Sequence, residues 1–596
     1  VPFLLALFAV GNQAQAQLTI SSPYRTVSSG SWDDIAIWQV YDGNDWVPAT
    51  EFPNGTNSGP VKIQSGHNIF IGSTVSIDEL TIDESASVAP SEASLQVLDG
   101  PGDDVICNGT ITLGTAGLAM DANATVIIGS TGHLITDNFA SISSNNGNGT
   151  LSILASGDWN ENSNFGFSVS NTTIENFGTV NLNTANGNFN LNGTSSFQNS
   201  GQVTFASEFT LTTDASATFI NNNDGTVIKN GPIPSTIDAS VGYTNNGQVI
   251  VQEGTLTIES SNVTDNGTLE VQSGATFTRT TGAYFFNGSL VTNNGSISVS
   301  PFVLNLGEDG TQQLSGVGEY DGLTINNSGT LLDNSTAVTI NNELNLNNGI
   351  VQVPSGSKVV LRQGVVVNNA SNTSFINGDV EHVISDPGPV LYPVGSGSTY
   401  SPVTLDPSFT TGGSVTVKAF QNDYPELQLS SLNPSKTVNK YWRITNNGLV
   451  FSECDMVFNW TAADVDPTAD PQNFSLAYLF DNEWALPVVQ SRTSTSLSVL
   501  DLHEFGDFAI GEVGACTVNI PDLALKQALL DNPGINTNND GDIQCSEAAA
   551  FSSTLLINNR GISDLTGIEA FTNITGLNAS HNNISSVNLS QNNQLI

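Results

Sequence analysis

Short runs in which apolar residues alternate with Thr, Ser or Asn recur through the middle of the chain. Each run follows a turn of the Asn-Gly, Asp-Gly or Ser-Gly type, as in "TDNGTLEV" and "TNNGSISV". The turn glycines, spaced by roughly 20–34 residues, are Gly178, Gly201, Gly225, Gly247, Gly267, Gly295 and Gly329. Alternation predicts strands with one buried face, on which Leu269 and Val271 point inward. A repeat of about 22 residues predicts a solenoid with one coil per repeat.

We therefore predict a mainly β protein with a parallel β-helix over residues 101–385. Its coils would be right-handed by the general preference of parallel crossover connections. Coils spaced by about 4.8 Å would give a solenoid on the order of 60 Å long. Inward Asn side chains at the turns are expected to stack as amide ladders.

Residues 17–100 are predicted to cap the first coil, because an open solenoid end exposes unpaired strand edges. This segment combines Trp32, Trp38 and Trp46 with a string of short strands. The alternative is an aromatic platform that binds sugar. The sequence leaves that alternative open.

The pattern changes after the solenoid. Residues 386–513 contain strand-like runs such as "SVTVKAF" and "KYWRIT", at spacings typical of an immunoglobulin-like β-sandwich. Residues 514–553 begin with "IPDLALKQALL", an amphipathic helix, and are predicted to form a helix–loop–helix cap. Over residues 554–596, apolar positions recur about 22 residues apart, which predicts leucine-rich repeats. The sequence is expected to stop inside that repeat array.

Residues 1–16 read as a secretory signal peptide whose first, basic part is missing. An apolar run is followed by Ala14 and Ala16, the small residues that a signal peptidase accepts. No other apolar run approaches the length of about 18 residues that a membrane-spanning helix needs, so we expect no transmembrane span. We expect the protein to be secreted and to reside outside the cell or on its outer surface.

Charge and cysteine content narrow the choice of partners. Thirteen Lys and Arg against 56 Asp and Glu give a net charge of −43, although only 12% of residues are charged. A surface so poor in cations disfavours nucleic acid and anionic lipid as partners. The four cysteines do not make a disulfide scaffold. Cys107 and Cys454 are expected to be buried thiols, and the pairing of Cys516 with Cys545 stays open.

The segment "NTNNDGDIQCSE", residues 536–547, fits the spacing of an EF-hand calcium loop. The candidate ligands are Asn536, Asn538, Asp540, Asp542 (through its backbone carbonyl), Gln544 and Glu547. Gly541 supplies the sharp turn and Ile543 the apolar anchor. Because Asn536 stands where Asp is usual, we expect weak Ca²⁺ binding, about 10⁻⁴ to 10⁻³ M, with a structural role. The alternative is an ordinary polar turn between two helices.

Taken together, four groups of residues resemble modular adhesin-like proteins that gliding and marine bacteria export by the type IX secretion route. They are "GSWDDIAIW", "NGDVEHVI" with "YPVGSGSTYSPVTL", "NKYWRITNNG" with "GDFAIGE", and "IPDLALKQALL" with "INTNNDGDIQCSEA". The resemblance implies export by that route, surface display and a modular β-helix stalk. It also implies a sorting domain after the repeats, beyond Ile596.

An enzyme is the main rival interpretation, because parallel β-helices often act on polysaccharides. Between Lys62 and Lys358 the only basic residues are Lys229 and Arg279, which disfavours a uronate lyase. "GDD" at residues 102–104 and "GH" at residues 132–133 resemble two polygalacturonase motifs. However, adjacent carboxylates on one strand point to opposite faces.

The leading hypothesis is a non-catalytic adhesin or matrix protein that presents binding modules on a β-helix stalk. Its partners would be proteins or glycans on surfaces or in a matrix. A polysaccharide-active hydrolase and a glycan-binding accessory protein remain the alternatives. The sequence identifies neither the ligand nor the oligomeric state.

Overall fold

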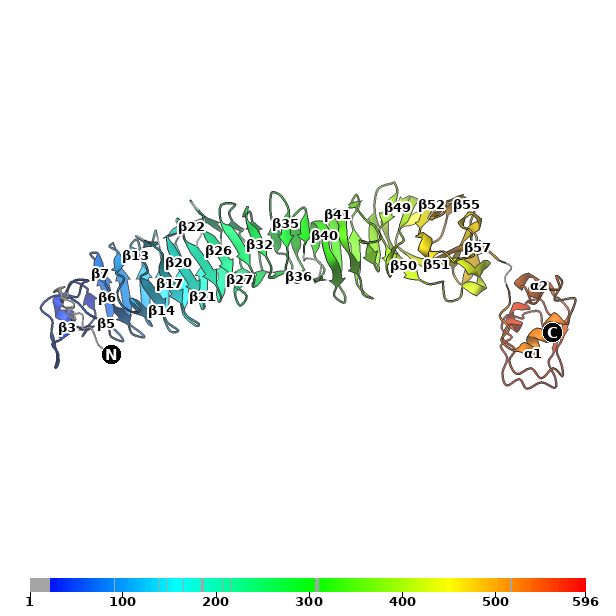
Figure 1. Cartoon of the computed structure of the whole chain (residues 1–596), viewed down its shortest axis with the longest axis horizontal. Helices are drawn as coiled ribbons and strands as arrows, with labels where there is room; N and C mark the ends of the chain where they lie inside the picture. Colours follow the sequence, from blue (N-terminus) through cyan, green and yellow to red (C-terminus); the bar gives the residue numbers. More distant parts are fainter. Residues whose placement is uncertain are drawn as a thin grey trace, which may run out of the picture. The chain divides into compact units, whose positions relative to one another are not determined.

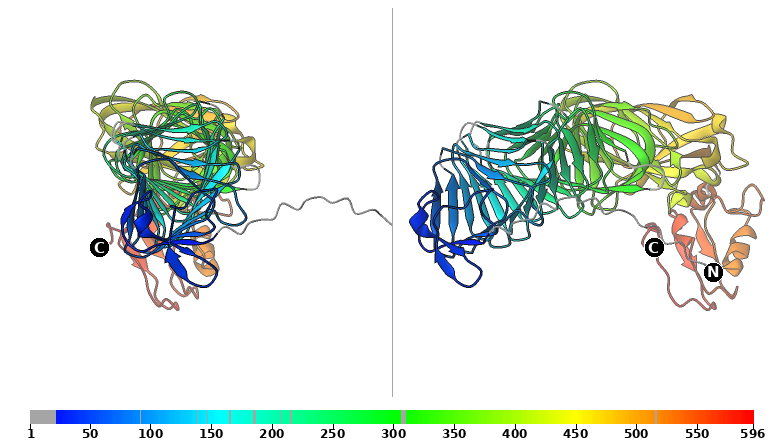
Figure 2. Two further views of the ribbon diagram at one scale, coloured as in Figure 1. Left: turned by 90° about the vertical axis from the view of Figure 1, so that its left-hand side faces the viewer. Right: turned by 60° about the vertical axis from the view of Figure 1, so that its left-hand side comes forward.

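The computed structural model describes residues 22–596, apart from residues 91, 138, 146, 164–165, 184–186, 207, 215, 306–309 and 515–516. The chain divides into two compact units, with the boundary between Gly282 and Ala283. Strands of the first unit stack as successive rungs (Figures 1 and 2). The prediction of a mainly β protein built on a parallel solenoid is confirmed. The predicted signal peptide, residues 1–16, lies outside the described residues.

Each coil of the first unit contributes three strands, so the solenoid has three rows of parallel strands. The first row contains β5 (Val61–Ile63), β8 (Leu80–Ile82), β11 (Val105–Cys107), β14 (Thr125–Ile128), β17 (Gly149–Ile153), β20 (Thr172–Asn176), β23 (Ser196–Asn199), β26 (Thr218–Asn221), β29 (Gly242–Asn245) and β32 (Val263–Asp265). From β8 to β32, paired residues such as Val105↔Leu80 and Tyr243↔Val263 are one repeat apart in the sequence. Parallel pairing already includes β5 and β8, which come before residue 101.

After its first-row strand, each coil adds one strand to the second row and then one strand to the third row. The second row contains β6 (Asn68–Ile71), β9 (Ser87–Pro90), β12 (Thr110–Leu113), β15 (His133–Thr136), β18 (Asp158–Glu161), β21 (Thr179–Leu182), β24 (Gln202–Phe205), β27 (Thr226–Lys229), β30 (Gln248–Val251) and β33 (Thr268–Val271). The third row contains β7 (Val75–Ile77), β10 (Leu95–Val97), β13 (Gly117–Met120), β16 (Ser141–Ser144), β19 (Phe167–Ser170), β22 (Gly187–Asn192), β25 (Phe209–Thr212), β28 (Ser235–Ile237), β31 (Thr255–Ile258) and β34 (Thr276–Thr278). Leu269 and Val271 are buried, as the alternation predicts.

The turn glycines recur because successive coils touch at the turns. A Cβ on Gly201 would lie 2.2 Å from the carbonyl oxygen of Gly178, and one on Gly267 would lie 2.1 Å from that of Gly247. No side chain fits at such a distance from backbone, so glycine is required at Gly178, Gly201, Gly225, Gly247 and Gly267. A Cβ on Gly329 would meet only the Ile350 carbonyl oxygen, at 3.6 Å. The repeat signal in the sequence therefore has a steric origin.

A buried amide ladder runs beside these turns. Nδ2 of Asn176, Asn199, Asn221 and Asn245 donates to Oδ1 of the next member, at 2.7, 2.7, 2.8 and 2.8 Å, and the ladder reaches Asp265. All five side chains are buried. Asn221 Nδ2 also donates to the carbonyl of Gly225, in the turn that follows it, and to that of Gln248, in the next coil. The predicted ladder is thus present, and it satisfies polar groups that the coils bury.

Aromatic rings and one lysine complete the interior. Trp159 lies 5.4 Å from Phe167 and 5.9 Å from Phe189, centroid to centroid. Lys229 occupies an inward position, paired with Phe205 of the preceding coil, and its side chain is fully buried. Lys229 Nζ donates to the carbonyl of Gly231 at 2.6 Å. Burial lowers the pKa of Lys229, because desolvation penalises the charged amine.

The segment predicted as a cap contains short strands and a helical turn before the first coil. The elements are β1 (Tyr24–Thr26), β2 (Gly30–Ser31), η1 (Ile35–Ile37), β3 (Trp38–Tyr41) and β4 (Trp46–Pro48). β3 pairs antiparallel with both β1 and β4, whereas β1 pairs parallel with β5. The antiparallel strands therefore join directly onto the first parallel coil.

The second unit also begins with parallel pairing. Its strands are β35 (Tyr284–Phe286), β36 (Leu290–Asn293), β37 (Ser296–Ser298), β38 (Phe302–Leu304), β39 (Thr311–Ser315), β40 (Glu319–Leu332), β41 (Ala337–Gln352), β42 (Lys358–Leu361), β43 (Val366–Asn368), β44 (Ile376–Asn377) and β45 (Val380–Ile384). The long strands β40 and β41 pair with each other through several register shifts. In this sheet, parallel pairing ends at β45, whose next neighbour, β50, runs antiparallel.

Two antiparallel sheets follow in what we call the antiparallel region, residues 386–513. One sheet continues from β45 through β50 (Gly413–Gln421), β51 (Leu432–Asn447), β57 (Asp507–Val513), β53 (Phe474–Phe480) and β54 (Glu483–Ala485). The other contains β46 (Val390–Tyr392), β49 (Val403–Thr411), β52 (Val450–Asn459), β56 (Ser496–Leu502) and β55 (Val489–Arg492). Short elements are β47 (Gly395–Ser396), β48 (Thr399–Tyr400), η2 (Leu427–Leu429), η3 (Ala462–Asp464) and η4 (Pro471–Asn473). Trp442 and Phe458 pack between the sheets with ring centroids 5.2 Å apart.

One ion pair is buried in the antiparallel region. Lys440 Nζ lies 3.4 Å from Asp464 Oδ1, and their side chains are 1% and 10% exposed. Asp464 also accepts hydrogen bonds from Thr399 and from Thr461. Burial lowers the pKa of Lys440, and Asp464 partly offsets that effect.

The buried side chain of His382 leads us to predict that acid lowers the stability of the second unit. His382 of β45 is 3% exposed, and burial lowers its pKa below the usual 6.5. The neutral ring is therefore preferred in the folded state. The stability that the neutral His382 ring contributes is fully present above about pH 6.5, the pKa of histidine in the unfolded chain. It is lost as the pH falls below that value. Denaturation at pH 7.5 and pH 5 should show that His382→Gln reduces the loss of stability in acid. The exposed control His581→Asn should leave the loss unchanged; equal pH dependence in both variants would contradict the prediction.

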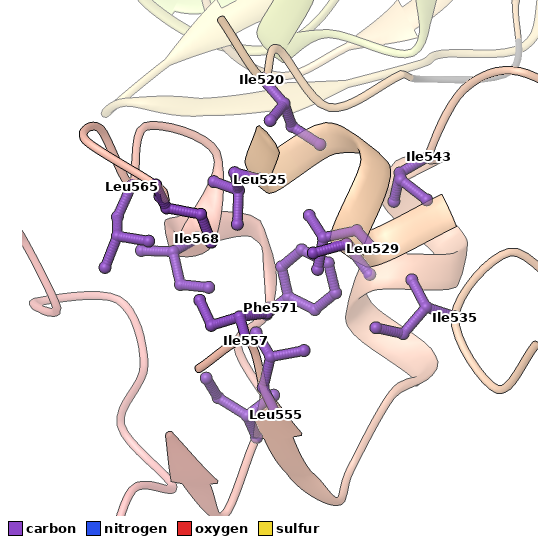
Figure 3. Close-up of a cluster of buried hydrophobic side chains, with 14 residues drawn as sticks. Ile520, Leu525, Leu529, Ile535, Ile543, Leu555, Ile557, Leu565, Ile568 and Phe571 are labelled. Atoms are coloured by element: carbon purple, nitrogen blue, oxygen red, sulfur yellow. The ribbon is translucent and has the colours of Figure 1, made fainter. Parts of the chain in front are cut away.

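The C-terminal module, residues 517–596, has its own hydrophobic core (Figure 3). Its elements are α1 (Leu523–Leu530), α2 (Cys545–Ala550), β58 (Thr554–Leu556), η5 (Ile568–Ala570) and β59 (Gly576–Asn578). Leu525, Leu529 and Phe571 lie in this core, together with the loop residues Ile535 and Ile543. β58 and β59 are parallel and place Leu555 opposite Leu577, its counterpart in the sequence repeat.

Candidate functional site

The candidate calcium loop, residues 536–547, connects α1 to α2. α1 begins after Asp522, whose Oδ1 accepts hydrogen bonds from the backbone N–H groups of Ala524 and Leu525. Oδ2 of the same carboxylate accepts from Ser563 and Asp564. These donors hold the pKa of Asp522 well below its usual range. The helix that precedes the loop is therefore fixed to the segment around residue 563.

Four of the predicted ligands converge through their side chains. Asn538 Nδ2 donates to Asp540 Oδ2 and to Gln544 Oε1, both at 2.9 Å. Gln544 Nε2 donates to Asp540 Oδ2 at 2.8 Å. Asn536 Nδ2 donates to the Asp540 carbonyl at 3.0 Å, and Asn536 Oδ1 accepts from the Asp540 N–H at 3.2 Å. The amide groups of Asn538 and Gln544 therefore contact the Asp540 carboxylate, and the Asn536 amide contacts the Asp540 backbone.

Glu547, the fifth predicted ligand, lies at the inner side of the loop. Its Oε1 accepts from the Thr537 N–H at 2.7 Å, the Thr537 hydroxyl at 2.9 Å and the Asn538 N–H at 3.2 Å. Its Oε2 accepts from the Gln544 N–H at 3.1 Å. These donors lower the pKa of Glu547 against the opposing effect of burial, which is the largest single influence. Thr537, which no motif singled out, is thus part of this arrangement.

The side chain of Asp542 points elsewhere. Its carboxylate pairs with Lys526 Nζ of α1 at 2.5 Å. The predicted role of Asp542 involves only its backbone carbonyl, and that role stays a prediction. Lys526 was not anticipated, because its contact with Asp542 depends on how the loop folds back on α1.

The donor set fits a weakly held calcium ion. Calcium prefers oxygen ligands, and the loop supplies two carboxylates, Asp540 and Glu547, together with three side-chain amides. An amide that now donates can present its oxygen instead, by a flip about its last side-chain bond. Ile543 is fully buried in the module core and anchors the loop. Within the described ranges, no cluster of three or more His, Cys, Asp or Glu suited to a metal is found, so a site here depends on the amides.

The cysteine predictions have separate outcomes. Cys107 and Cys454 are buried free thiols, as predicted, and burial raises the pKa of each to about 12. Cys545 is disulfide-bonded. Cys516 lies outside the described residues, so its pairing with Cys545 stays a prediction.

The tryptophans at the N-terminal end do not form an exposed platform. Trp32 and Trp38 are each 1% exposed, and their rings meet edge to face at 5.0 Å. Trp32 Nε1 donates to the carbonyl of Pro53, and Trp38 Nε1 donates to that of Trp32. Trp46 is half-buried, with the Arg25 guanidinium 4.4 Å above its ring. Trp32 and Trp38 therefore belong to a hydrophobic core.

The residues that resembled a polygalacturonase do not form a common site. Asp104 is 2% exposed and accepts from Gly100 and Thr125, whereas Asp103 is exposed. Both residues precede β11 and neither lies on a strand, so the predicted reason for their separation is wrong, but one carboxylate is buried and the other exposed. His133 is on β15, in a different strand row, and pairs with Asp158.

One carboxylate pair in the second unit lies on a common outward face. Glu319 Oε2 and Asp321 Oδ1 both accept from Asn341 Nδ2, at 3.3 and 3.4 Å. Glu319 also pairs with Arg362 at 2.8 Å, and Asp321 accepts from the Ser298 hydroxyl. Each carboxylate therefore already has a partner on the sheet.

No protein-family model, curated protein or solved structure matches this chain. Over the parts that the structure describes, none of the helices has the length and apolar character needed to cross a bilayer. Functional conclusions therefore rest on the residues and their arrangement.

Proposed function

We propose that this protein is a non-catalytic extracellular or cell-surface protein, an adhesin or matrix component, whose β-helix stalk presents binding modules. The observation that carries the proposal is the outward surface of the solenoid. Thr210, Thr236, Thr257 and Thr278 stand in register on β25, β28, β31 and β34. Uncharged hydroxyl columns of this kind can form many weak contacts with a neighbouring protein or glycan, but they carry no acid–base chemistry.

Finer features of the architecture belong to the same proposal. The antiparallel region would be an immunoglobulin-like β-sandwich, and α1, the loop and α2 a helix–loop–helix cap. The pairing of Leu555 with Leu577 supports the start of a leucine-rich array. Export by the type IX route follows from the sequence resemblance.

The adhesin proposal is tested on the secreted form of the full chain. Glycan arrays and surfaces coated with matrix proteins should retain it, without release of reducing sugar. If the C-terminal module contacts a given surface, a calcium chelator should reduce the retention of the protein on that surface. Absence of retention on every surface would sink the proposal.

A polysaccharide hydrolase is the second candidate, favoured by the shared face of Glu319 and Asp321. Two carboxylates on one face are the minimum for glycoside hydrolysis. Reducing-sugar release from a polysaccharide panel that disappears in Glu319→Gln would establish this activity. The matched control is Glu343→Gln, which removes a neighbouring carboxylate on β41.

We propose further that the loop binds Ca²⁺ weakly and that the ion orders the C-terminal module. With a dissociation constant of about 10⁻⁴ to 10⁻³ M, 10 mM Ca²⁺ should stabilise the module by about 1.4–2.7 kcal/mol. Glu547→Gln should abolish this calcium-dependent gain. Asp542→Asn should retain it, since that side chain pairs with Lys526 instead. Calorimetry of each variant with calcium and with chelator measures the gain; no gain in the unsubstituted protein would refute the site.

A further inference from the structure

A groove of about 510 Å³ opens at one end of the antiparallel region. Its walls come from β51, β53 and β57 of one sheet, from β52 of the other, and from the loop that precedes β57. It shares no residue with the calcium loop or with the solenoid. None of the sequence motifs pointed to it.

The apolar part of the groove is aromatic. Phe451 and Phe505 stack with centroids 4.4 Å apart and an interplanar angle of 19°. Phe505 is 7% exposed, so the pair is held firmly. Phe480, from the end of β53, is 43% exposed and adds a third ring to the wall. An alkyl chain or a cation can pack against the faces of rings held in this way.

The charged part of the groove has an excess of carboxylate. Arg443 and Asp507 neutralise each other through two hydrogen bonds, Nε to Oδ1 at 2.8 Å and a terminal nitrogen to Oδ2 at 3.0 Å. Asp481 and Glu504 also line the groove and are exposed. No hydrogen bond or ion pair engages either carboxylate among the described residues. The groove therefore carries two uncompensated negative charges beside aromatic rings.

We propose that this groove binds a lysine side chain of a partner protein. The long aliphatic stem of lysine is apolar and would lie along Phe451 and Phe480, with the ammonium group reaching Asp481 and Glu504. Charge complementarity selects this occupant, since a neutral sugar would leave both carboxylates unpaired. An amino sugar would supply the charge but not the apolar stem. The inference rests on the proposed binding role and deepens it by naming what one module recognises.

The test uses the full chain and a short immobilised peptide with three spaced lysines, compared with the same peptide acetylated at every lysine. We expect binding of the first peptide only, weakened by salt. The double variant Asp481→Asn with Glu504→Gln should lose about tenfold in affinity, which corresponds to about 1.4 kcal/mol. Phe451→Leu, which keeps an apolar contact but removes the ring face, should also weaken binding.

The matched control neutralises two exposed acids outside the groove, Asp386→Asn with Glu426→Gln. Equal weakening in this control would show a general charge effect and overturn the assignment. Groove-dependent binding of a glucosamine oligomer in place of the peptide would also overturn it. Peptide binding that survives the groove variants would remove this inference, and surface retention by the same variants would leave the adhesin proposal standing. Groove-dependent peptide binding by a protein that no tested surface retains would support this inference and contradict the adhesin proposal.

Discussion

Asp464→Asn is expected to lower the free energy of unfolding of the antiparallel region by about 3 kcal/mol. The substitution keeps the size of the side chain but leaves Lys440, whose side chain is 1% exposed, without its counter-charge. The remaining hydrogen-bond acceptor of Lys440 Nζ is the Ser396 carbonyl at 3.4 Å, which cannot replace a carboxylate. Urea denaturation followed by tryptophan fluorescence measures the loss, because Trp442 lies in the same core.

A second substitution separates the charge effect from packing. Adding Lys440→Met to Asp464→Asn should recover much of the lost stability, because a buried ion pair can often be replaced by apolar groups. Lys436→Met, which breaks the more exposed pair with Glu512, should cost much less. If the double variant were less stable than Asp464→Asn alone, the ionic explanation would be wrong.

Asn221→Ala should cost the solenoid about 3 kcal/mol, the second large effect. Asn221 is the central member of the amide ladder, so its loss removes the donor to Asn245 Oδ1 and to two backbone carbonyls. It also removes the acceptor for Asn199. Hydrogen exchange should show the largest loss of protection in the coils that contain β23, β26 and β29.

The matched control is Asn223→Ala, in the same turn and exposed. It should change stability by less than about 0.5 kcal/mol. A loss of protection spread evenly over the first unit, or an equal effect of the control, would contradict the ladder as the cause.

The solenoid could be predicted from the sequence because its determinants are local and repeated. The alternation of Leu269 and Val271 with polar residues fixes which face is buried, and coil contact at Gly201 and Gly267 fixes the turn residue. Strict alternation even places Lys229 inward, against its polarity. The start of the solenoid was harder to predict, because β8 is followed by residues 83–86, which contain no glycine and so lack the turn that marks later coils.

Contacts between distant segments could not be predicted. Lys440 and Asp464 meet although they belong to different elements, β51 and η3, and the groove combines Phe451 with residues around Phe480 and Phe505. Such contacts depend on the order of the strands in two sheets, and no short stretch of the sequence indicates that order. In the candidate calcium loop, the motif pointed to Asn538, Asp540 and Gln544, whose side chains contact one another because their spacing lies within a single turn-and-helix segment. It did not predict Thr537 or Lys526, whose contacts depend on the path of the loop.

The burial of Lys229 has a practical consequence for how the solenoid responds to proteases. Proteases of the trypsin class cut after Lys or Arg, and between Lys62 and Lys358 the chain offers only Lys229 and Arg279. Lys229 is fully enclosed and Arg279 is partly exposed, so Arg279 is the cleavage point that such enzymes could reach in that long segment. Trypsin is therefore expected to cut the folded segment between Lys62 and Lys358 at Arg279 and to leave Lys229 uncut.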